Sequence, residues 1–139
     1  MSGSFRKAMT EISEAVYTLT DLGVHVLSPA DPRIVGEIGG FMFVASDKQR
    51  IVKQVQERHL AMIAVSDFVW LADPEGYVGP SAAMEIGFAK AKGVRVFASE
   101  VPSDITLREF VTVSTLRQAV AFAKRDSSRL VVQRRLLQA

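Results

Sequence analysis

The chain has 139 residues, with 17 basic and 15 acidic side chains, two histidines and no cysteine. This length fits one domain with its own core. The lack of cysteine excludes disulfides, zinc–thiolate sites and cysteine catalysis, and two histidines are too few for a histidine-rich metal site. A net charge of +2 is too small to indicate nucleic-acid binding. No apolar run is long enough to span a membrane, and the N-terminus lacks the apolar core of a signal peptide, so the sequence predicts a cytoplasmic protein that needs no metal or cofactor.

The basic residues in excess are concentrated near the C-terminus. They are Lys124, Arg125, Arg129, Arg134 and Arg135. We interpret them as a solvated face rather than a binding patch. The sequence therefore predicts a single domain over residues 1–139 with a basic tail from about residue 126.

The first half of the chain predicts two helices and two short strands. A three-and-four apolar spacing from Phe5 to Leu22 indicates a helix that Ser4 can cap and Gly23 can end. Residues 24–28 read as a strand stopped by Pro29, residues 29–40 as a long loop, and residues 41–44 as a short strand or buried loop. Asp47 is the expected N-cap of a second helix, whose apolar stripe is Ile51, Val52, Val55, His59, Met62 and Ile63.

The second half alternates strands and helices more clearly. Residues 67–72 form a continuous apolar strand, as in a parallel sheet covered on both faces. A loop over residues 73–79 precedes a third helix from Pro80 to about Lys92. We expect a buried strand at 94–98, a helical turn at 103–109, a last strand at 110–113 and a final helix from Ser114 to about Arg125.

This alternation predicts an α/β fold with a mostly parallel sheet and right-handed crossovers. Ligands of such sheets bind beyond the carboxyl ends of the strands. That rule points to the loops at 29–40, 73–80 and 98–104 and to the start of the third helix.

An open α/β sheet normally begins with a central strand, whereas this chain begins almost directly with a helix. Three explanations are open. The sheet lacks that strand, another segment such as Leu130–Val132 fills its place, or the true start lies upstream.

Glu85 is the candidate with the sharpest signal. It is the only charge in the segment 81–89, and its helix neighbours at three and four positions are Ser81, Ala82, Phe88 and Ala89. None of them is a basic partner that would explain the carboxylate. A carboxylate on a tightly packed helix near the ligand edge is a candidate nucleophile or general base. The alternative is a glutamate on the solvent face or one paired with a distant arginine.

Other candidates surround the same edge. Gly79 and Ser81 open the third helix, where free N–H groups suit a phosphate or carboxylate, and a simple cap is the competing explanation. Gly3, Ser4 and Arg6 form a second candidate phosphate cradle. These five residues are candidate substrate ligands.

Three further residues have both a functional and a structural interpretation. His59 lies on an apolar stripe, where a core histidine is the usual explanation. Asp67 begins a buried strand as a cap or a ligand contact. Tyr77 lies in the ligand-edge loop, where it can stack on a base or anchor the loop.

Three segments taken together resemble the nucleoside 2-deoxyribosyltransferase superfamily. This group includes 2′-deoxynucleoside 5′-phosphate N-hydrolases and the CMP or hydroxymethyl-CMP hydrolases. The matching segments are 2–6 with 23–29, 57–60 leading to 66–70, and 76–81 through 85–89 to 93–96. The resemblance covers roughly residues 2–120.

The resemblance implies a flavodoxin-like (Rossmann-type) three-layer fold and a homodimer or larger homo-oligomer. It assigns Glu85 as the carboxylate that attacks the anomeric carbon of a nucleoside or nucleotide. It also assigns Gly3, Ser4 and Arg6 to the sugar-phosphate end, and it puts Gly79 and Ser81 where the family holds phosphate or sugar hydroxyls. The expected activity is that of an N-glycosidase or pentosyltransferase with a covalent intermediate.

Two features depart from the family pattern. The family's first strand, with a tyrosine before the Gly-Ser motif, is absent. His59 stands where hydrolase relatives have an acidic residue; a protonated histidine there can donate a proton to the departing base. Two other functions are kept open: a non-catalytic nucleotide-binding or sensing domain of the same fold, and an oligomeric interaction module related to signalling domains that cleave NAD.

Overall fold

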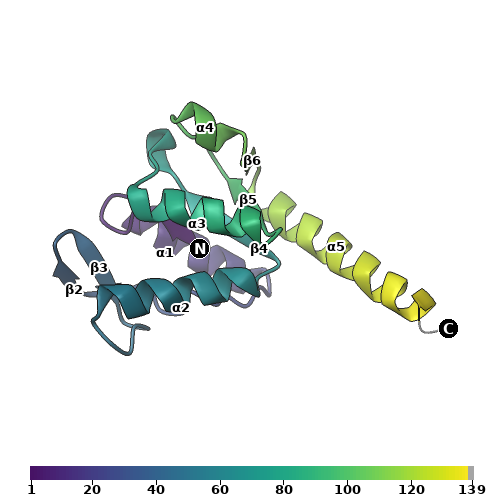
Figure 1. Ribbon diagram of the computed structural model, residues 1–139, viewed down its shortest axis with the longest axis horizontal. Helices are drawn as coiled ribbons and strands as arrows, with labels where there is room; N and C mark the ends of the chain where they lie inside the picture. Colours follow the sequence, from purple (N-terminus) through teal and green to yellow (C-terminus); the bar gives the residue numbers. More distant parts are fainter. Residues whose placement is uncertain (138–139) are drawn as a thin grey trace.

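A parallel four-stranded sheet forms the centre of the molecule. The computed structural model describes the backbone of residues 1–137 and the side chains of residues 1–126. The strands lie in the order β1 (Ser2–Gly3), β4 (Phe68–Ala72), β5 (Arg95–Ala98) and β6 (Val111–Val113). Helices cover both faces (Figure 1): they are α1 (Met9–Asp21), α2 (Val52–Ala64), α3 (Pro80–Ala91) and α5 (Leu116–Leu137), with a short α4 (Ile105–Arg108) near β6. This arrangement confirms the α/β prediction and has the three layers of a flavodoxin-like, Rossmann-type fold.

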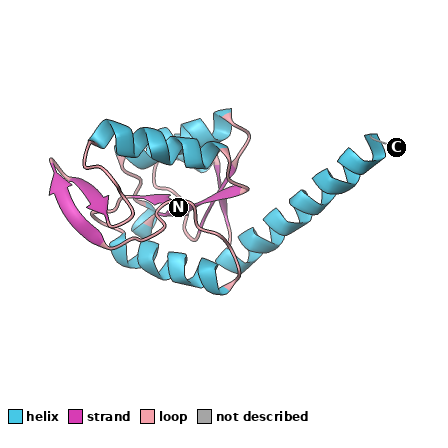
Figure 2. Cartoon of the chain, turned by 90° about the horizontal axis from the view of Figure 1, so that it is seen from below, coloured by secondary structure: helices cyan, strands magenta, loops and turns pink. Residues whose placement is uncertain are grey.

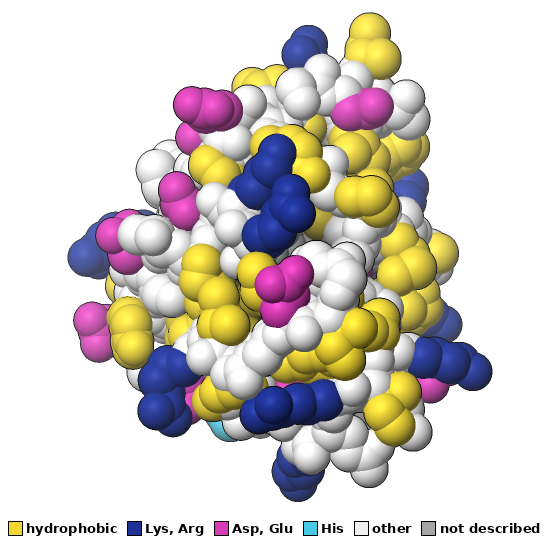
Figure 3. Space-filling view, turned by 90° about the vertical axis from the view of Figure 1, so that its left-hand side faces the viewer, with side chains coloured by type: hydrophobic (Ala, Val, Ile, Leu, Met, Phe, Trp, Pro, Cys, Tyr) yellow, Lys and Arg dark blue, Asp and Glu magenta, His cyan; other side chains and the backbone are white. Residues whose placement is uncertain are grey.

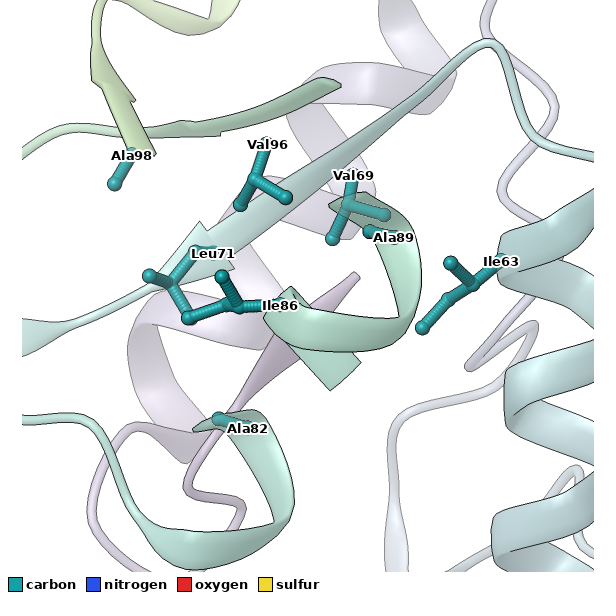
Figure 4. Packing of buried hydrophobic residues seen from close by; sticks show 8 residues of the cluster. All are labelled: Ile63, Val69, Leu71, Ala82, Ile86, Ala89, Val96 and Ala98. Carbon is teal, nitrogen blue, oxygen red and sulfur yellow. The ribbon is translucent and has the colours of Figure 1, made fainter. Parts of the chain in front are cut away.

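Alternate residues of the central strands face two separate cores, because successive side chains of a strand point to opposite faces. Val69 and Leu71 pack against α3, with Ile63 of α2 at the edge of the same cluster (Figure 4). Two alanines and one isoleucine of α3 complete it: Ala82, Ala89 and Ile86. Their small size lets α3 lie close to the sheet, as the sequence predicts.

The opposite face of the sheet is more aromatic. Trp70 and Phe97 pack against α1 and α5 through Ala15 and Ala119. The edge-on contact of Phe97 with Phe68, at a centroid distance of 6.0 Å, adds to this core. The sheet is therefore buried on both sides, which explains why β4 reads as a continuous apolar run.

The first position of the sheet is occupied by a very short strand. β1 has two residues, and its register pairs Ser2 with Leu71 and Gly3 with Ala72. The first strand is thus present in shortened form. Residues 130–132 do not fill its place, because they belong to α5.

Two of the elements predicted in the first half of the chain are wrong. Residues 24–28 form no strand but an irregular segment. Part of the predicted loop at 29–40 is instead β2 (Ile34–Ile38), which pairs antiparallel with β3 (Phe41–Val44). A two-residue turn, Gly39–Gly40, joins the two strands, and both glycines have the positive φ that such tight hairpin turns require.

Two predicted helix caps are also wrong. Ser4 does not cap α1: its carbonyl accepts from the N–H groups of Lys7 and Ala8, and the helix begins only at Met9. Asp47 does not cap α2, which begins at Val52; its carboxylate instead accepts from the Val44 N–H at 2.9 Å. Residues 4–8 therefore form a turn at the carboxyl end of β1, where the fold binds ligands.

Two elements extend from the body of the domain. The β2–β3 hairpin lies at one end and α5 projects at the other (Figure 2). On the face that carries the hairpin, hydrophobic side chains reach the surface between separate basic groups (Figure 3). Arg125 is exposed, in agreement with a solvated C-terminal face, while the side chains of Arg129, Arg134 and Arg135 lie outside the described part.

Candidate active site

Glu85 lies on the buried stripe of α3 rather than on its solvent face. The buried residues of this helix are Ala82, Glu85, Ile86 and Ala89, at the three-and-four spacing of one helix face. Glu85 is only 6% exposed. This excludes the solvent-face interpretation, and it means that the carboxylate needs polar partners from other elements.

Two elements, β1 and α2, supply those partners. Ser2 of β1 donates its hydroxyl to Glu85 Oε2. Gln56 of α2 donates from Nε2 to Oε1 at 2.8 Å. His59 of α2 brings Nε2 to 3.3 Å from Oε2, at an angle that leaves this nitrogen without a hydrogen bond in the described structure. Gln56 and His59 are three residues apart and therefore share a helix face. The distant-arginine alternative is not observed among the described residues, because the side chain at ion-pair distance from Glu85 is that of His59.

These partners keep the carboxylate ionised. Burial raises the pKa of Glu85, but the close approach and charge of a protonated His59 lower it, as do the bonds from Gln56 and Ser2. The net effect is a pKa below the ordinary value for glutamate. Glu85 is therefore a carboxylate, with electron pairs available, at neutral pH.

His59 connects this carboxylate to the segment before Pro29. Its Nδ1 lies 2.7 Å from Ser28 Oγ, and the Ser28 carbonyl accepts from the α-amino group of Met1 at 3.0 Å. Burial lowers the pKa of that amino group to about 6, against a smaller opposing effect of Glu85. The segment at 24–28, α2 and the N-terminus thus meet around one histidine.

The predicted phosphate-binding residues gather at the carboxyl edge of β1. A Cβ placed on Gly79 would lie 3.9 Å from the Ser4 Cβ and 3.5 Å from the Tyr77 hydroxyl. Gly79 is the N-cap of α3, and no side chain caps that helix. Ser81 is exposed in its first turn. Ser4, Gly79 and Ser81 therefore surround uncapped N–H groups, which suit an anion.

Gly3 is required by the close approach of β1 to β4. Its φ is +143°, and a Cβ there would lie 2.6 Å from the Ala72 carbonyl oxygen. Any side chain would push Ser2 and Ser4 away from their positions. Arg6 and Lys7 are exposed in the following turn, and the Lys7 ammonium lies 3.8 Å from the Tyr77 ring centroid. A base stacking on Tyr77 would have to share this ring with Lys7.

The structure does not bring Asp67 to this edge. Asp67 precedes β4, at the amino end of the strand, and it is exposed. Gly3, Ser4 and Gly79 lie at the carboxyl end. Asp67 instead lines a separate cavity of about 720 Å³ that also reaches Ser28 and His59.

Sequence reasoning missed Gln56 and Ser28, and it used Ser2 only as part of a motif. Gln56 could have been found from the sequence, because it precedes His59 by three residues and therefore shares its helix face. Ser28 has none: its contact with His59 spans 31 positions.

A second buried carboxylate, Asp73, also escaped the sequence analysis. Asp73 directly follows β4 and is 2% exposed, and neither carboxylate oxygen has a hydrogen-bond partner among the described residues. Burial raises its pKa to about 6, and the nearby charge of Glu100 adds to this. Asp73 is therefore a carboxyl group that takes up a proton at mildly acidic pH, at the ligand edge of the sheet.

Comparisons with known proteins give no match: no family model, no curated protein and no solved structure is similar to this chain. Within the described residues, no helix is long and apolar enough to cross a membrane. No group of three or more His, Cys, Asp or Glu side chains in that part of the chain is placed to hold a metal ion.

Proposed function

We propose that this protein cleaves or transfers the N-glycosidic bond of a nucleoside or nucleotide, with Glu85 as the nucleophile. The observation that carries the proposal is a buried carboxylate with a lowered pKa, held by Ser2, Gln56 and His59 next to the turn at residues 4–8. Such a group is ionised, oriented and shielded from water, as covalent glycosyl transfer requires. The resemblance to the nucleoside 2-deoxyribosyltransferase superfamily supports the same residue.

The proposed reaction has two steps. A Glu85 oxygen forms a bond to the anomeric carbon while the carbon–nitrogen bond breaks, and the base leaves with the electron pair of that bond. Water, or the nitrogen of a second base, then attacks the same carbon, releases Glu85 and gives up its proton. Hydrolysis and transfer differ only in this acceptor.

His59 is the candidate proton donor to the leaving base. Its Nε2 is buried, faces Glu85 and has no hydrogen bond within the described residues. Its Nδ1 contact with Ser28 holds the ring in place. A protonated His59 would give its proton to the departing base. The neutral imidazole ring that remains can then take the proton of the attacking water.

A nucleotide is favoured over a nucleoside because of the anion-binding groups near Glu85. The turn at residues 4–8, the uncapped start of α3 and the Ser81 hydroxyl provide donors for a phosphate. Arg6 and Lys7 add positive charge at the surface. We expect 5′-monophosphates to be better substrates than nucleosides.

The test is the release of free base from a panel of ribo- and deoxyribonucleoside 5′-monophosphates, measured by chromatography. Glu85→Gln should abolish release, and Glu57→Gln, an exposed glutamate on α2, is the matched control that should keep it. A substrate analogue with fluorine at C2′ slows the second step and should leave a sugar phosphate on Glu85, detected by peptide mass. Base release that persists in Glu85→Gln would contradict the assignment of the nucleophile.

A non-catalytic nucleotide-binding domain is the second candidate. This candidate is favoured because both carboxylate oxygens of Glu85 already accept hydrogen bonds from protein groups. In that case a nucleotide raises the melting temperature, but no base is released from any member of the panel. Failure of both binding and release would contradict both candidates.

The resemblance also leads us to propose a homodimer. Large apolar side chains on the hairpin and before α2 are exposed: Ile34 by 45%, Ile38 by 57% and Ile51 by 53%. Exposed large apolar side chains of this kind favour association. Light scattering on the protein and on an Ile34→Lys, Ile38→Lys double variant tests the proposal, since the variant should be monomeric.

A further inference from the structure

Gln56 is the most exposed of the three side chains that contact Glu85 in the described part of the chain. Ser2 is fully buried and His59 is 8% exposed, whereas Gln56 is half-buried at the surface of α2. Helices α2 and α3 pack side by side on one face of the sheet (Figure 1). The contacts from Gln56 and His59 place the Glu85 carboxylate between these two helices. A ligand therefore reaches this carboxylate from the side of Gln56.

The two oxygens of Glu85 have different surroundings. Oε2 accepts from the Ser2 hydroxyl and lies 3.3 Å from His59 Nε2, so buried groups enclose it. Oε1 accepts from Gln56 Nε2 at 2.8 Å, and within the described residues no other donor reaches it. Oε1 is therefore the oxygen on the accessible side of the carboxylate.

Gln56 uses only part of its amide for this bond. A glutamine side chain has two N–H donors and one carbonyl acceptor. One N–H is donated to Glu85, while the second N–H and the carbonyl have no partner among the described residues. The amide therefore presents a donor and an acceptor to a ligand, directly beside the carboxylate.

The stereochemistry of a nucleotide brings one sugar hydroxyl to this amide. The base leaves from the β face of the sugar, so a carboxylate that displaces it attacks from the α face. The 2′-hydroxyl of ribose is also on the α face, and its carbon is next to the carbon that is attacked. Whichever Glu85 oxygen forms the bond, the 2′-hydroxyl then lies beside the carboxylate, within reach of the group that binds Oε1.

We propose that Gln56 is a specificity-determining residue that binds the 2′-hydroxyl, and that it favours ribonucleoside 5′-monophosphates over their 2′-deoxy counterparts. The free half of the amide forms a hydrogen bond with the hydroxyl, which can both donate and accept, while the other N–H stays on Glu85. Hydrogen bonds to this hydroxyl strengthen in the transition state of glycosyl transfer. The inference rests on the proposed function of Glu85 as the nucleophile.

The test compares three sugars that carry the same base, with the full chain as the enzyme. The substrates are the ribo-, 2′-deoxyribo- and arabinonucleoside 5′-monophosphates, and in the arabino sugar the 2′-hydroxyl is on the β face, away from Glu85. Gln56→Met keeps the length of the side chain but removes both amide groups. Gln54→Met is the matched control, because Gln54 is exposed on the same helix.

The measured quantity is the ratio of kcat/KM for the ribonucleotide to kcat/KM for the deoxyribonucleotide. Comparing this ratio between variants cancels the different reactivity of the two sugars and any general loss of Glu85 function. Gln56→Met should lower the ratio by about tenfold, as the loss of one hydrogen bond implies, and should leave the arabino-to-deoxyribo ratio unchanged. Gln54→Met should change neither. An equal loss of activity on all three sugars, or an unchanged ribo-to-deoxyribo ratio, would overturn the proposal.

A binding experiment separates this inference from the proposed function. Ribose 5-phosphate and 2-deoxyribose 5-phosphate have no base to release, so calorimetry gives their dissociation constants even if no nucleotide is cleaved. Where base is released, the kinetic ratio decides on Gln56, and an unchanged ratio leaves Glu85 as the nucleophile. Where no base is released, the nucleophile assignment is wrong and binding decides. About tenfold tighter binding of ribose 5-phosphate that Gln56→Met abolishes supports the role of Gln56, and equal binding or none overturns it.

Discussion

Glu85 and Asp73 are two buried carboxyl groups with opposite ionisation behaviour. Glu85 has three polar neighbours from two other elements and a pKa below its ordinary value. Asp73 is buried at least as deeply but has no hydrogen-bond partner among the described residues, and its pKa rises to about 6. Burial alone therefore does not decide the charge of a carboxyl group in this protein; the donors that the fold brings to it do.

The two groups also contribute to stability with opposite dependence on pH. For Glu85, whose folded-state pKa is lowered, the stabilisation is present above the ordinary pKa of 4.5 and is lost as the pH falls through the folded-state value. For Asp73, the folded state binds its proton more tightly than the unfolded chain between pH 3.8 and about 6. Stability therefore falls as the pH rises through that interval and stays reduced above it.

The largest expected effect is the loss of the Glu85 carboxylate. Glu85→Ala leaves Ser2 and Gln56 without their acceptor and His59 without a negative partner, and should lower the free energy of unfolding by about 3 kcal/mol at pH 7. Urea denaturation measures this. The exposed Glu57→Ala should change stability by less than about 0.5 kcal/mol. Equal effects of the two substitutions would show that the Glu85 contacts contribute nothing.

Replacing Asp73 should have the opposite sign. Asp73→Asn removes a carboxylate that is ionised without partners, so it should stabilise the protein at pH 8 by about 1–3 kcal/mol. At pH 4, where Asp73 is already protonated, the effect should be near zero. Denaturation at both pH values tests this, and a stabilisation that is the same at pH 4 and pH 8 would contradict the raised pKa.

Two glycine substitutions, Gly3→Ala and Gly76→Ala, should perturb Glu85 and Asp73 separately. A Cβ at Gly3 would lie 2.6 Å from the Ala72 carbonyl oxygen, and one at Gly76 would lie 2.5 Å from that of Val101, both at positive φ. Each change to alanine should cost about 1–3 kcal/mol. Gly3→Ala should also raise the pKa of Glu85 by moving Ser2, and leave Asp73 unchanged.

Carboxyl carbon NMR titration measures these two pKa values in each variant. Gly76→Ala, which alters the loop after Asp73, should change the pKa of Asp73 and not that of Glu85. Gly87→Ala is the control, because it lies in α3 with open space around it, and it should be neutral or slightly stabilising. A shift of both pKa values in either variant would show that the sites are coupled.

The smallest effect is expected for Gln56. Gln56→Met keeps the length of the side chain but removes the donor to Glu85 Oε1, at a cost of about 1 kcal/mol. The pKa of Glu85 should rise, in the direction of the value that Asp73 shows. An unchanged Glu85 titration would mean that Ser2 and His59 alone maintain its charge.

The elements that could be predicted from the sequence are those whose pattern is local. The apolar runs of β4 and β5 and the pattern of α3 predicted these elements nearly to the residue, while the three-and-four spacing of α1 predicted the helix but began it at Phe5 rather than at Met9. The sequence also singled out Glu85, but whether it faces the core or solvent was decided only by the structure, where it shares a buried stripe with Ala82, Ile86 and Ala89. Because periodicity depends only on residues that are close in the chain, it can be recognised in a single sequence.

The partners and charges of the site depend on contacts between distant parts of the chain. Ser2 and Gln56 lie 83 and 29 positions from Glu85, and the charge of Glu100, which adds to the raised pKa of Asp73, also comes from a distant position in the chain. Residues 24–28 show the same limit: their strand pattern is present, but a strand forms only where a neighbouring backbone supplies its hydrogen bonds. Long-range contacts set these properties, and no local pattern records them.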